Sequence, residues 1–297
     1  MHLPINGEVN PNNVEVFDST TISLFVDVFK GAGRNPINGK KKGGLKVHAV
    51  LPLDSMVPEI IWMTEASKND KDFLGQLKAA PGTIYVFDKG YVNYSIYREW
   101  TDMGVWYVTR LNDNANYEIV DQIRHDVHGY LSGGAILDQV ILLKTKGEPL
   151  KARLITYKDP LTGKILKFLS NLFEYQSQTI IMLYKNRWEI EPFFKKLKQN
   201  FELKWFFSDS QEGIKTQVWV ALIANLIFSV IHKRVKEAEQ FTTLVAMARS
   251  NMISYVCLVS LINAKEIRAE DRDLKKVQLD IFSLEQGGVF HKKEKSP

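Results

Sequence analysis

The residues best suited to chemistry lie in one short charged stretch, YKNRWEIEPFFKKLKQN. Four of them have a spacing typical of a single helix face: Tyr184, Arg187, Glu191 and Lys198. At about 100° per residue, a regular helix would place all four within an arc of roughly 60°. That face would present a phenol, a carboxylate and two cations. A carboxylate flanked by positive charge suits a site that holds a metal ion beside a phosphate backbone.

The same spacing also fits an ordinary amphipathic helix with a solvated charged face. Glutamate paired with lysine or arginine one turn away stabilises such helices slightly. Pro192 raises a further question, because proline inside a helix removes a hydrogen bond and crowds the preceding turn. We therefore expect either a kink or a new helix at Pro192. In both cases Lys198 can leave the face that the other three share.

Two aspartates upstream lie in strand-like surroundings. Asp18 is inside the apolar and hydroxylated run VFDSTT, and Asp88 ends the apolar run TIYVFD. Aspartate is disfavoured inside strands, and a buried carboxylate is costly unless it is paired or bound to a metal. An edge position or a turn cap would also explain each aspartate alone. Three carboxylates on neighbouring elements, however, can hold two Mg²⁺ ions about 4 Å apart for displacement at a phosphodiester.

Strand and helix patterns alternate around these residues. The first third predicts strands at 14–25, 45–53, 59–67, 83–91 and 105–111, and helices at 71–80 and about 93–103. From 112 to about 172, short alternating runs between Gly- and Pro-containing turns predict a β-rich segment. Helical periodicity returns at 177–198, 214–236 and 241–264.

Composition sets broad limits on the class of protein. A chain of 297 residues that is 45% hydrophobic can bury a sizeable core, and its net charge of +5 is compatible with nucleic acid. The single cysteine, Cys257, excludes a disulfide framework within the chain and a cysteine-cluster zinc site. No signal peptide is evident, and the longest apolar run, 219–231, predicts a buried helix too short to span a bilayer. We expect a soluble intracellular protein.

Other polar and aromatic candidates favour structural roles. Lysines 40–42 lie in a glycine-rich loop and could contact a DNA backbone, although such lysines are usually just solvated. His48 is expected to be packed or hydrogen-bonded within a strand. Asp70 and Asp72 have the position of helix-start residues. The residues expected in the core are Trp205, Phe206 and Phe207.

The two aspartates and the charged stretch together resemble the DDE transposases of bacterial insertion sequences, specifically the insertion-sequence-four family. That family's hallmark is tyrosine, two residues, arginine, three residues, glutamate, six residues, lysine. The four residues of the opening stretch fit it at every spacing. The FDST context of Asp18 and the FDKGY context of Asp88 are similar to the family's two aspartate motifs. The resemblance covers roughly residues 14–229.

The resemblance implies an α/β fold with a ribonuclease H-like, mixed-sheet catalytic core. A β-rich insertion would precede the last catalytic helix, and further helices would follow the core. We place the first part of the core at 10–111, the insertion at 112–172 and the second part of the core at 173–235. Residues 236–297 would form C-terminal helices and a polar tail.

The same resemblance implies the roles of the site residues. The catalytic residues and metal ligands would be Asp18, Asp88 and Glu191. They would hold two Mg²⁺ ions, with Mn²⁺ as a substitute. The residues on DNA phosphates near the cleaved end would be Tyr184, Arg187 and Lys198, since arginine suits bidentate phosphate contact and lysine acts as a mobile point charge. Relatives excise their element through a DNA hairpin with base flipping, for which the stacking side chain would be Trp188 or Trp106.

We therefore predict a transposase that cleaves DNA and transfers strands at insertion-sequence ends in a Mg²⁺-dependent reaction. Its partners would be double-stranded transposon ends and target DNA, bound by a homodimer in the bacterial cytoplasm and on the nucleoid, with no membrane. Full-length relatives carry a helical DNA-binding region before the first aspartate. Only 17 residues precede Asp18, so we expect that region to be lacking. Two alternatives stay open: an inactive, truncated remnant that only binds DNA, and a ribonuclease H-like nuclease without strand transfer.

Overall fold

The computed structural model describes residues 9–24, 29, 43–123, 135–145, 147–201, 203–234 and 240–251. Contacts within the chain group it into two compact units, 1–227 and 228–297. The division falls inside helix α5 (Gln211–Arg234). The described part of the second unit holds the end of α5 and helix α6 (Phe241–Asn251). Lysines 40–42 and Cys257 lie outside the described residues.

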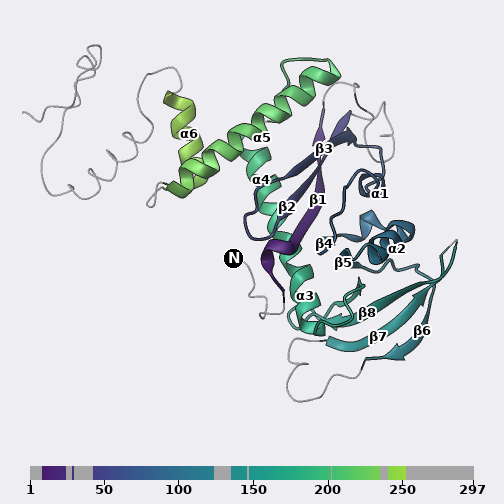
Figure 1. The fold of residues 1–297 in the computed structure, drawn as a ribbon. Helices are drawn as coiled ribbons and strands as arrows, with labels where there is room; N and C mark the ends of the chain where they lie inside the picture. The colour runs from purple at the N-terminus through teal and green to yellow at the C-terminus, as the bar shows by residue number, and fades with distance from the viewer. Residues whose placement is uncertain are drawn as a thin grey trace, which may run out of the picture. The chain divides into compact units, whose positions relative to one another are not determined.

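The described part of the first unit contains one mixed sheet of nine strands, in the order β3-β2-β1-β4-β5-β9-β8-β7-β6 (Figure 1). Strands β1 to β3 are antiparallel to one another, whereas β4 is parallel to β1 and β5 is parallel to β4. Strands β9, β8, β7 and β6 continue the sheet with antiparallel pairing. The strands are β1 (Val14–Ser23), β2 (Gly44–Pro52), β3 (Ile60–Glu65), β4 (Ile84–Phe87), β5 (Trp106–Arg110), β6 (Tyr117–Gln122), β7 (Ala135–Leu143), β8 (Leu150–Lys158) and β9 (Ile165–Ser170).

Helices cover both faces of this sheet. Helices α1 (Lys71–Leu74) and α2 (Tyr94–Asp102) pack on one face. Helices α3 (Ser177–Asn186) and α4 (Ile190–Asn200) pack on the other, with the start of α5. The sheet thus separates two hydrophobic cores, one for each layer of helices.

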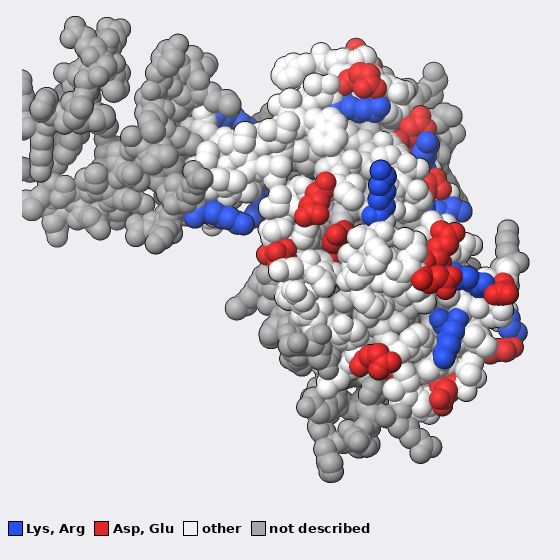
Figure 2. All heavy atoms as spheres, viewed as in Figure 1, with Lys and Arg blue, Asp and Glu red and all other residues white. Residues whose placement is uncertain are grey.

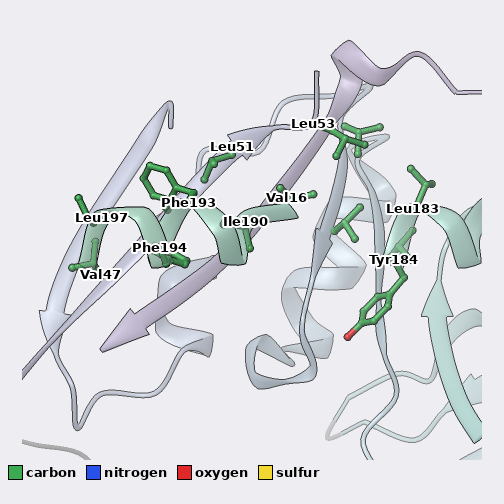
Figure 3. Packing of buried hydrophobic residues seen from close by; sticks show 14 of the residues in the cluster. Val16, Val47, Leu51, Leu53, Leu183, Tyr184, Ile190, Phe193, Phe194 and Leu197 are labelled. Carbon is green, nitrogen blue, oxygen red and sulfur yellow. The ribbon is translucent and has the colours of Figure 1, made fainter. Parts of the chain in front are cut away.

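The alternation of side chains along β1 and β4 decides what faces α3 and α4. Val16 and Val86 belong to the core under α3 and α4, whereas Phe17 and Phe87 belong to the core under α1 and α2. Figure 3 shows α4 lying across the sheet, with these side chains packed between helix and strands: Ile190, Phe193, Phe194 and Leu197. The next positions with the same alternation, 18 and 88, therefore face α3 and α4.

The strands predicted in the first third of the chain are confirmed, and the segment 112–172 contains β6 to β9. The helix expected at 71–80 is much shorter, because α1 ends at Leu74 and Gly75 is its C-cap residue. Glycine costs about 1 kcal/mol in a helix interior relative to alanine, so it favours an end at this point.

The apolar run at 219–231 lies in α5, but the prediction of a buried helix was wrong. Its inner side packs in the core through Val218, Ala221 and Leu222. Large side chains on its other side are exposed: Trp219, Val220, Ile223, Ile227 and Val230. Among the described residues this is the one helix, Gln211–Lys233, that is long and apolar enough to cross a membrane. Length and composition alone are weak support for a span, since core helices of soluble proteins pass the same test.

Candidate active site between β1, β4 and helix α3

The two predicted strand aspartates lie at neighbouring positions on adjacent parallel strands. β1 and β4 run parallel with Phe17 opposite Phe87, so Asp18 and Asp88 occupy the next position of the register. Asp18 lies inside β1, as its sequence context predicted. Asp88 directly follows β4 and has an extended backbone before the short 3₁₀ helix η2 (Lys89–Tyr91). Because of the alternation along both strands, the two carboxylates lie on the side of α3 and α4.

Arg187 links the first aspartate to the predicted glutamate. Its Nη1 lies 2.6 Å from Oδ2 of Asp18, and its Nη2 lies 3.9 Å from Oε1 of Glu191. The side chain of Arg187 is 8% exposed, that of Asp18 is 23% exposed and that of Glu191 is 56% exposed. The buried Nε of Arg187 has no hydrogen-bond partner within the described residues. Arg187 therefore has one strong partner, one loose partner and one donor that is still unused.

Tyr184 links the helix to the second aspartate. Its hydroxyl donates to Oδ1 of Asp88 over 3.0 Å, and its ring lies 5.5 Å from the guanidinium carbon of Arg187. The ring packs against Phe168, and burial raises the pKa of Tyr184 to about 12 although Arg187 acts in the opposite direction. Tyr184 is therefore a neutral donor at ordinary pH. Tyr184 and Arg187 together tie both aspartates to one turn of the chain.

The charged stretch is not one regular helix, which agrees with the kink or new helix expected from Pro192. α3 ends at Asn186, a 3₁₀ helix covers Arg187–Glu189, and α4 begins at Ile190. Pro192 thus lies in the first turn of a new helix, where its missing N–H removes no hydrogen bond. Three residues at about 120° each rotate the following helix by roughly 60° relative to a regular α-helix.

Glu191 and Lys198 both follow the 3₁₀ step on α4, where they lie about 20° apart around the helix, so the step turns them together relative to Tyr184 and Arg187. Lys198 is exposed in the last turn of α4, and in the described part of the chain no hydrogen bond or ion pair connects it to Tyr184, Arg187 or Glu191. Partial desolvation lowers the pKa of Lys198. In the described part of the chain, contacts link Tyr184 to Arg187 and Arg187 to Glu191, whereas Lys198 lies about two helical turns beyond Glu191 along α4.

The charge balance around Asp18 is unfavourable for its ionised form. Burial raises the pKa of Asp18, and the carboxylates of Asp88 and Asp70 act in the same direction. Arg187 and the backbone N–H of Ser19, which donates to Oδ1 of Asp18 over 2.8 Å, oppose the rise without cancelling it. A cation placed beside Asp18 and Asp88 would stabilise both carboxylates.

The sequence analysis missed a third aspartate near this pair. Asp70 was predicted as a helix-start residue, yet its side chain makes no capping bond to α1. Instead it accepts a hydrogen bond from Oγ of Ser19 over 3.1 Å and lies 3.0 Å from Nζ of Lys46. Gly90 is the sequence signal that could have indicated this approach, because a Cβ there would lie 3.3 Å from Oδ2 of Asp70.

His48 lies behind the aspartates in a wholly buried aromatic layer. Its Nδ1 is 3.0 Å from the hydroxyl of Tyr91, and its ring stacks on Phe73 at 5.0 Å. Its Nε2 has no partner in the described part of the chain. Burial lowers the pKa of His48 to about 4, so the ring is neutral at ordinary pH. The expectation of a packed and hydrogen-bonded histidine is confirmed.

The carboxylates fit a divalent metal only in part. Asp18 and Asp88 offer hard oxygen ligands side by side, as Mg²⁺ prefers. Within the described residues, however, no group of three or more His, Cys, Asp or Glu side chains is close enough to hold a metal ion. Arg187 contacts both Asp18 and Glu191, and Glu191 is the most exposed of the three acids. The aspartate pair is therefore in place, while the third acid is not gathered with it.

The two tryptophans considered for stacking differ in exposure. Trp188 directly follows Arg187 and is 61% exposed, whereas Trp106 starts β5 and packs partly against the sheet core. On the face shown in Figure 2, acidic and basic side chains are interspersed rather than gathered into one basic patch. Recognition on that face would therefore depend on particular side chains.

A second arginine fixes the start of α3. Arg153 of β8 is wholly buried and pairs through Nε and Nη2 with both oxygens of Asp138, over 2.9 and 2.6 Å. Its Nη1 donates to the carbonyl oxygens of Leu172, over 2.7 Å, and Tyr175. Ser177, the first residue of α3, donates to Asp138 over 2.7 Å. Strands β7 and β8 thus hold the helix that carries Tyr184.

These features are those of a DDE transposase domain, and the chain belongs to that family: residues 11–227 match its family model, described as the transposase DDE domain. Enzymes of this family generally use divalent metal ions. The relationship to transposases of insertion sequences that the tyrosine, arginine, glutamate and lysine spacing predicted is confirmed.

Individual relatives agree with this assignment. A protein of Sinorhizobium fredii named as a transposase is 29% identical over 220 residues, which is 73% of this chain and 60% of the relative. A Geobacillus stearothermophilus protein named as a transposase for insertion sequence element IS5377 is 23% identical over 229 residues, 76% of this chain and 59% of the relative. The matched part of the chain thus spans about 60% of the length of these relatives.

Among solved structures, the chain is similar to a piggyBac transposase synaptic complex with hairpin DNA. The match covers 86% of this chain and 57% of that chain, at 11% identity and a TM-score of 0.45. The fold is therefore assigned from the strand order and the family match.

Proposed function

We propose that this chain is the DNA-cleaving and strand-joining core of an insertion-sequence transposase. Its first five strands, in the order β3-β2-β1-β4-β5 with three antiparallel and two parallel members, support a ribonuclease H-like core. Strands β6 to β9 would be the insertion before the catalytic helix. The observation that carries the proposal is the linked group in which Arg187 and Tyr184 contact both strand aspartates.

In this proposal the acids hold the metal that the family uses. Asp18, Asp88 and Glu191 would hold Mg²⁺, or Mn²⁺ in its place. The bound metal would activate a water or a 3′-hydroxyl and stabilise the leaving oxygen in phosphodiester displacement. The raised pKa of Asp18 supports a cation at this position, because burial disfavours the ionised carboxyl and Arg187 offsets this only in part. Glu191 would have to approach the aspartate pair, and its exposure leaves it free to do so.

The basic and phenolic groups would hold the DNA backbone. Arg187 has a planar fork of donors suited to a phosphate, and its Nε is unused within the described residues. Tyr184, as a neutral phenol, keeps Asp88 oriented and can donate to a phosphate oxygen. Lys198 would contact a phosphate farther along the strand, since it stands apart from the others. The exposed Trp188 would stack on a flipped base if the reaction passes through a hairpin.

The test is cleavage and strand transfer by the full chain on a mini-transposon built from the DNA that flanks its reading frame. We expect Mg²⁺-dependent nicking and joining in the parent protein. Alanine in place of each predicted acid should abolish both, and the residues to change are Asp18, Asp88 and Glu191. Asp102→Ala is the matched control, because Asp102 is an exposed aspartate at the end of α2.

The products also separate the alternatives. Strand transfer leaves the cut end covalently attached to target DNA, whereas a nuclease would release it. A parent chain that binds DNA but neither cuts nor joins would indicate a binding remnant. Unchanged activity in one acid variant would remove that residue from the site. Sedimentation of the DNA complex would show whether two copies hold two ends, as the proposed homodimer requires.

A further inference from the structure

Two aromatic side chains stand exposed between α4 and α5, contrary to the core position expected for them. Trp205 is 69% exposed, and Phe207 is exposed over its whole side chain. Phe206 between them packs partly against the core under α3 and α4. The chain therefore turns two rings into solvent and one inward. Large apolar side chains grouped on a surface commonly mark a contact site.

This turn, residues 205–210, is held in place by helix α5. The side-chain amide of Gln217 donates to the carbonyl oxygen of Trp205 over 2.6 Å and accepts from the N–H of Phe207 over 3.1 Å. One turn earlier in α5, Gly213 lies so close that a Cβ there would be 2.2 Å from Oγ of Ser208. Ser210 accepts from the N–H of Gly213 over 3.1 Å. The exposed rings are thus carried on a positioned backbone, which lowers the entropic cost of binding through them.

The charges around the turn favour an anionic partner. From residue 195 to residue 217 the sequence contains five lysines and three acids. Lys204, directly before Trp205, is exposed, and so are the α4 lysines Lys195, Lys196 and Lys198. Glu212 is paired with Lys215 over 2.9 Å, and Asp209 within the turn is exposed, so the excess of positive charge lies on the α4 side of the turn. Exposed rings beside basic side chains bind single-stranded nucleic acid, in which the base faces are open to stacking.

We infer that Trp205 and Phe207 form a stacking site for unpaired DNA bases, here called the stacking turn. This inference rests on the proposed function, since it assumes that the chain binds DNA. Glu191 and Asn200 are nine residues apart on α4, so the end of α4, five residues before Trp205, lies roughly 14 Å from Glu191 along the helix. That length corresponds to about four base pairs. The stacking turn would hold DNA that is opened a few nucleotides from the cut.

The experiment measures affinity of the full chain for two labelled DNAs, in EDTA so that no cleavage intervenes. One is a closed duplex, and the other is the same duplex with a short central bubble of unpaired thymidines. We expect Trp205→Ala and Phe207→Ala each to weaken binding to the bubble about tenfold, and to the closed duplex by less than about threefold. Trp205→Phe keeps a ring and should stay within about threefold of the parent.

Two controls separate stacking from charge and from general loss of apolar surface. Trp219→Ala removes another exposed tryptophan and should leave both affinities within about threefold. Lys204→Gln should lower the slope of log affinity against log salt by about one, whereas Trp205→Ala should leave that slope unchanged.

Each remaining outcome overturns the inference. Equal losses on both DNAs, or the same loss in Trp219→Ala, would show that the rings do not stack on unpaired bases. Loss of self-association in sedimentation, with DNA affinity unchanged, would assign the turn to a protein contact. If Trp205→Ala and Phe207→Ala bind the bubble as tightly as the parent protein does, the stacking site is rejected and the proposed function is not. A parent chain that binds neither DNA removes the proposed function as well.

Discussion

Arg153 and Arg187, both in the unit of residues 1–227, form ion pairs that differ in how completely their donors are used. Arg153 is wholly buried, donates to both carboxylate oxygens of Asp138 through Nε and Nη2, and donates through Nη1 to backbone carbonyl oxygens. Arg187 is almost as buried, yet it has one short contact to Asp18, one long contact to Glu191 and an unused Nε within the described residues. Arg153 therefore has its hydrogen bonds within the protein. Arg187 keeps a donor, Nε, that has no partner among the described residues and that a ligand could use.

The partner aspartates differ in the same way. Asp138 receives two bonds from Arg153 and one from Ser177, so its charge is fully compensated. Asp18 lies with Asp88 and Asp70 nearby, and its pKa is raised, chiefly by burial. A complete cluster stabilises the fold, whereas an incomplete one costs stability and favours binding of a cation. The predictions below test this contrast.

The largest effect should follow removal of the complete cluster's arginine. Arg153→Met leaves the Asp138 carboxylate buried without its partner, so the free energy of unfolding should fall by about 3–5 kcal/mol. Urea denaturation measures it. The double variant with Asp138→Leu should recover much of the loss, and Lys158→Met, at the exposed end of β8, should lose little. A loss below about 1 kcal/mol for Arg153→Met would show that the Arg153–Asp138 cluster is not structurally required, and would contradict the proposed difference between the two clusters.

The next effect is the pH dependence of stability that comes from His48, on the opposite face of the sheet from the Arg187–Asp18 cluster. The folded protein keeps His48 neutral down to about pH 4, whereas the unfolded chain takes up that proton near 6.5. The unfolded state therefore binds more protons between these values, and stability falls as pH falls through that window. The contribution is roughly 3 kcal/mol. Urea midpoints between pH 7 and 4 should lose this slope in His48→Gln and keep it in His232→Gln.

Arg187→Gln should affect DNA binding far more than folding. Loss of charged hydrogen bonds to a phosphate should weaken DNA affinity about 10- to 100-fold. The free energy of unfolding should change by less than in Arg153→Met, because the side chain of Asp18 is 23% exposed and water can solvate its carboxylate. Fluorescence anisotropy and urea denaturation give the two values. Arg187→Lys should rescue only part of the affinity, since the planar fork is lost.

The smallest effect should be a gain in stability. Because the pKa of Asp18 is raised in the folded state, ionised Asp18 lowers stability at pH 7, and this loss is relieved as pH falls through the raised pKa. Asp18→Asn should therefore raise the free energy of unfolding at pH 7 by about 1 kcal/mol or less. Thermal melting should show the gap closing at low pH. Asp138→Asn in the complete cluster should do the opposite and destabilise.

Much of the site could be predicted, because it follows from local patterns. Alternation along two apolar strands indicated where Asp18 and Asp88 lie, and the spacing of Tyr184 and Arg187 gave their common face. Asp70 was missed as a neighbour because its approach depends on the packing of α1 against β1, and Gly90 was its one sequence signal. The exposure of Trp205 and Phe207 could not be predicted from the sequence either, since large apolar side chains are usually buried.

The sequence by itself determined the family, the two strands that carry Asp18 and Asp88, and the charged stretch that holds Tyr184, Arg187 and Glu191, since these depend on residue type and short spacing. Only the tertiary structure decided how far the charged face extends. The 3₁₀ step at Arg187–Glu189 turns Glu191 and Lys198 together relative to Tyr184 and Arg187, and the length of α4 carries Lys198 about two turns beyond Glu191. Packing of α4 on the sheet through Ile190, Phe193 and Leu197 fixes that turn, because the helix must bury these side chains whatever its charged residues face.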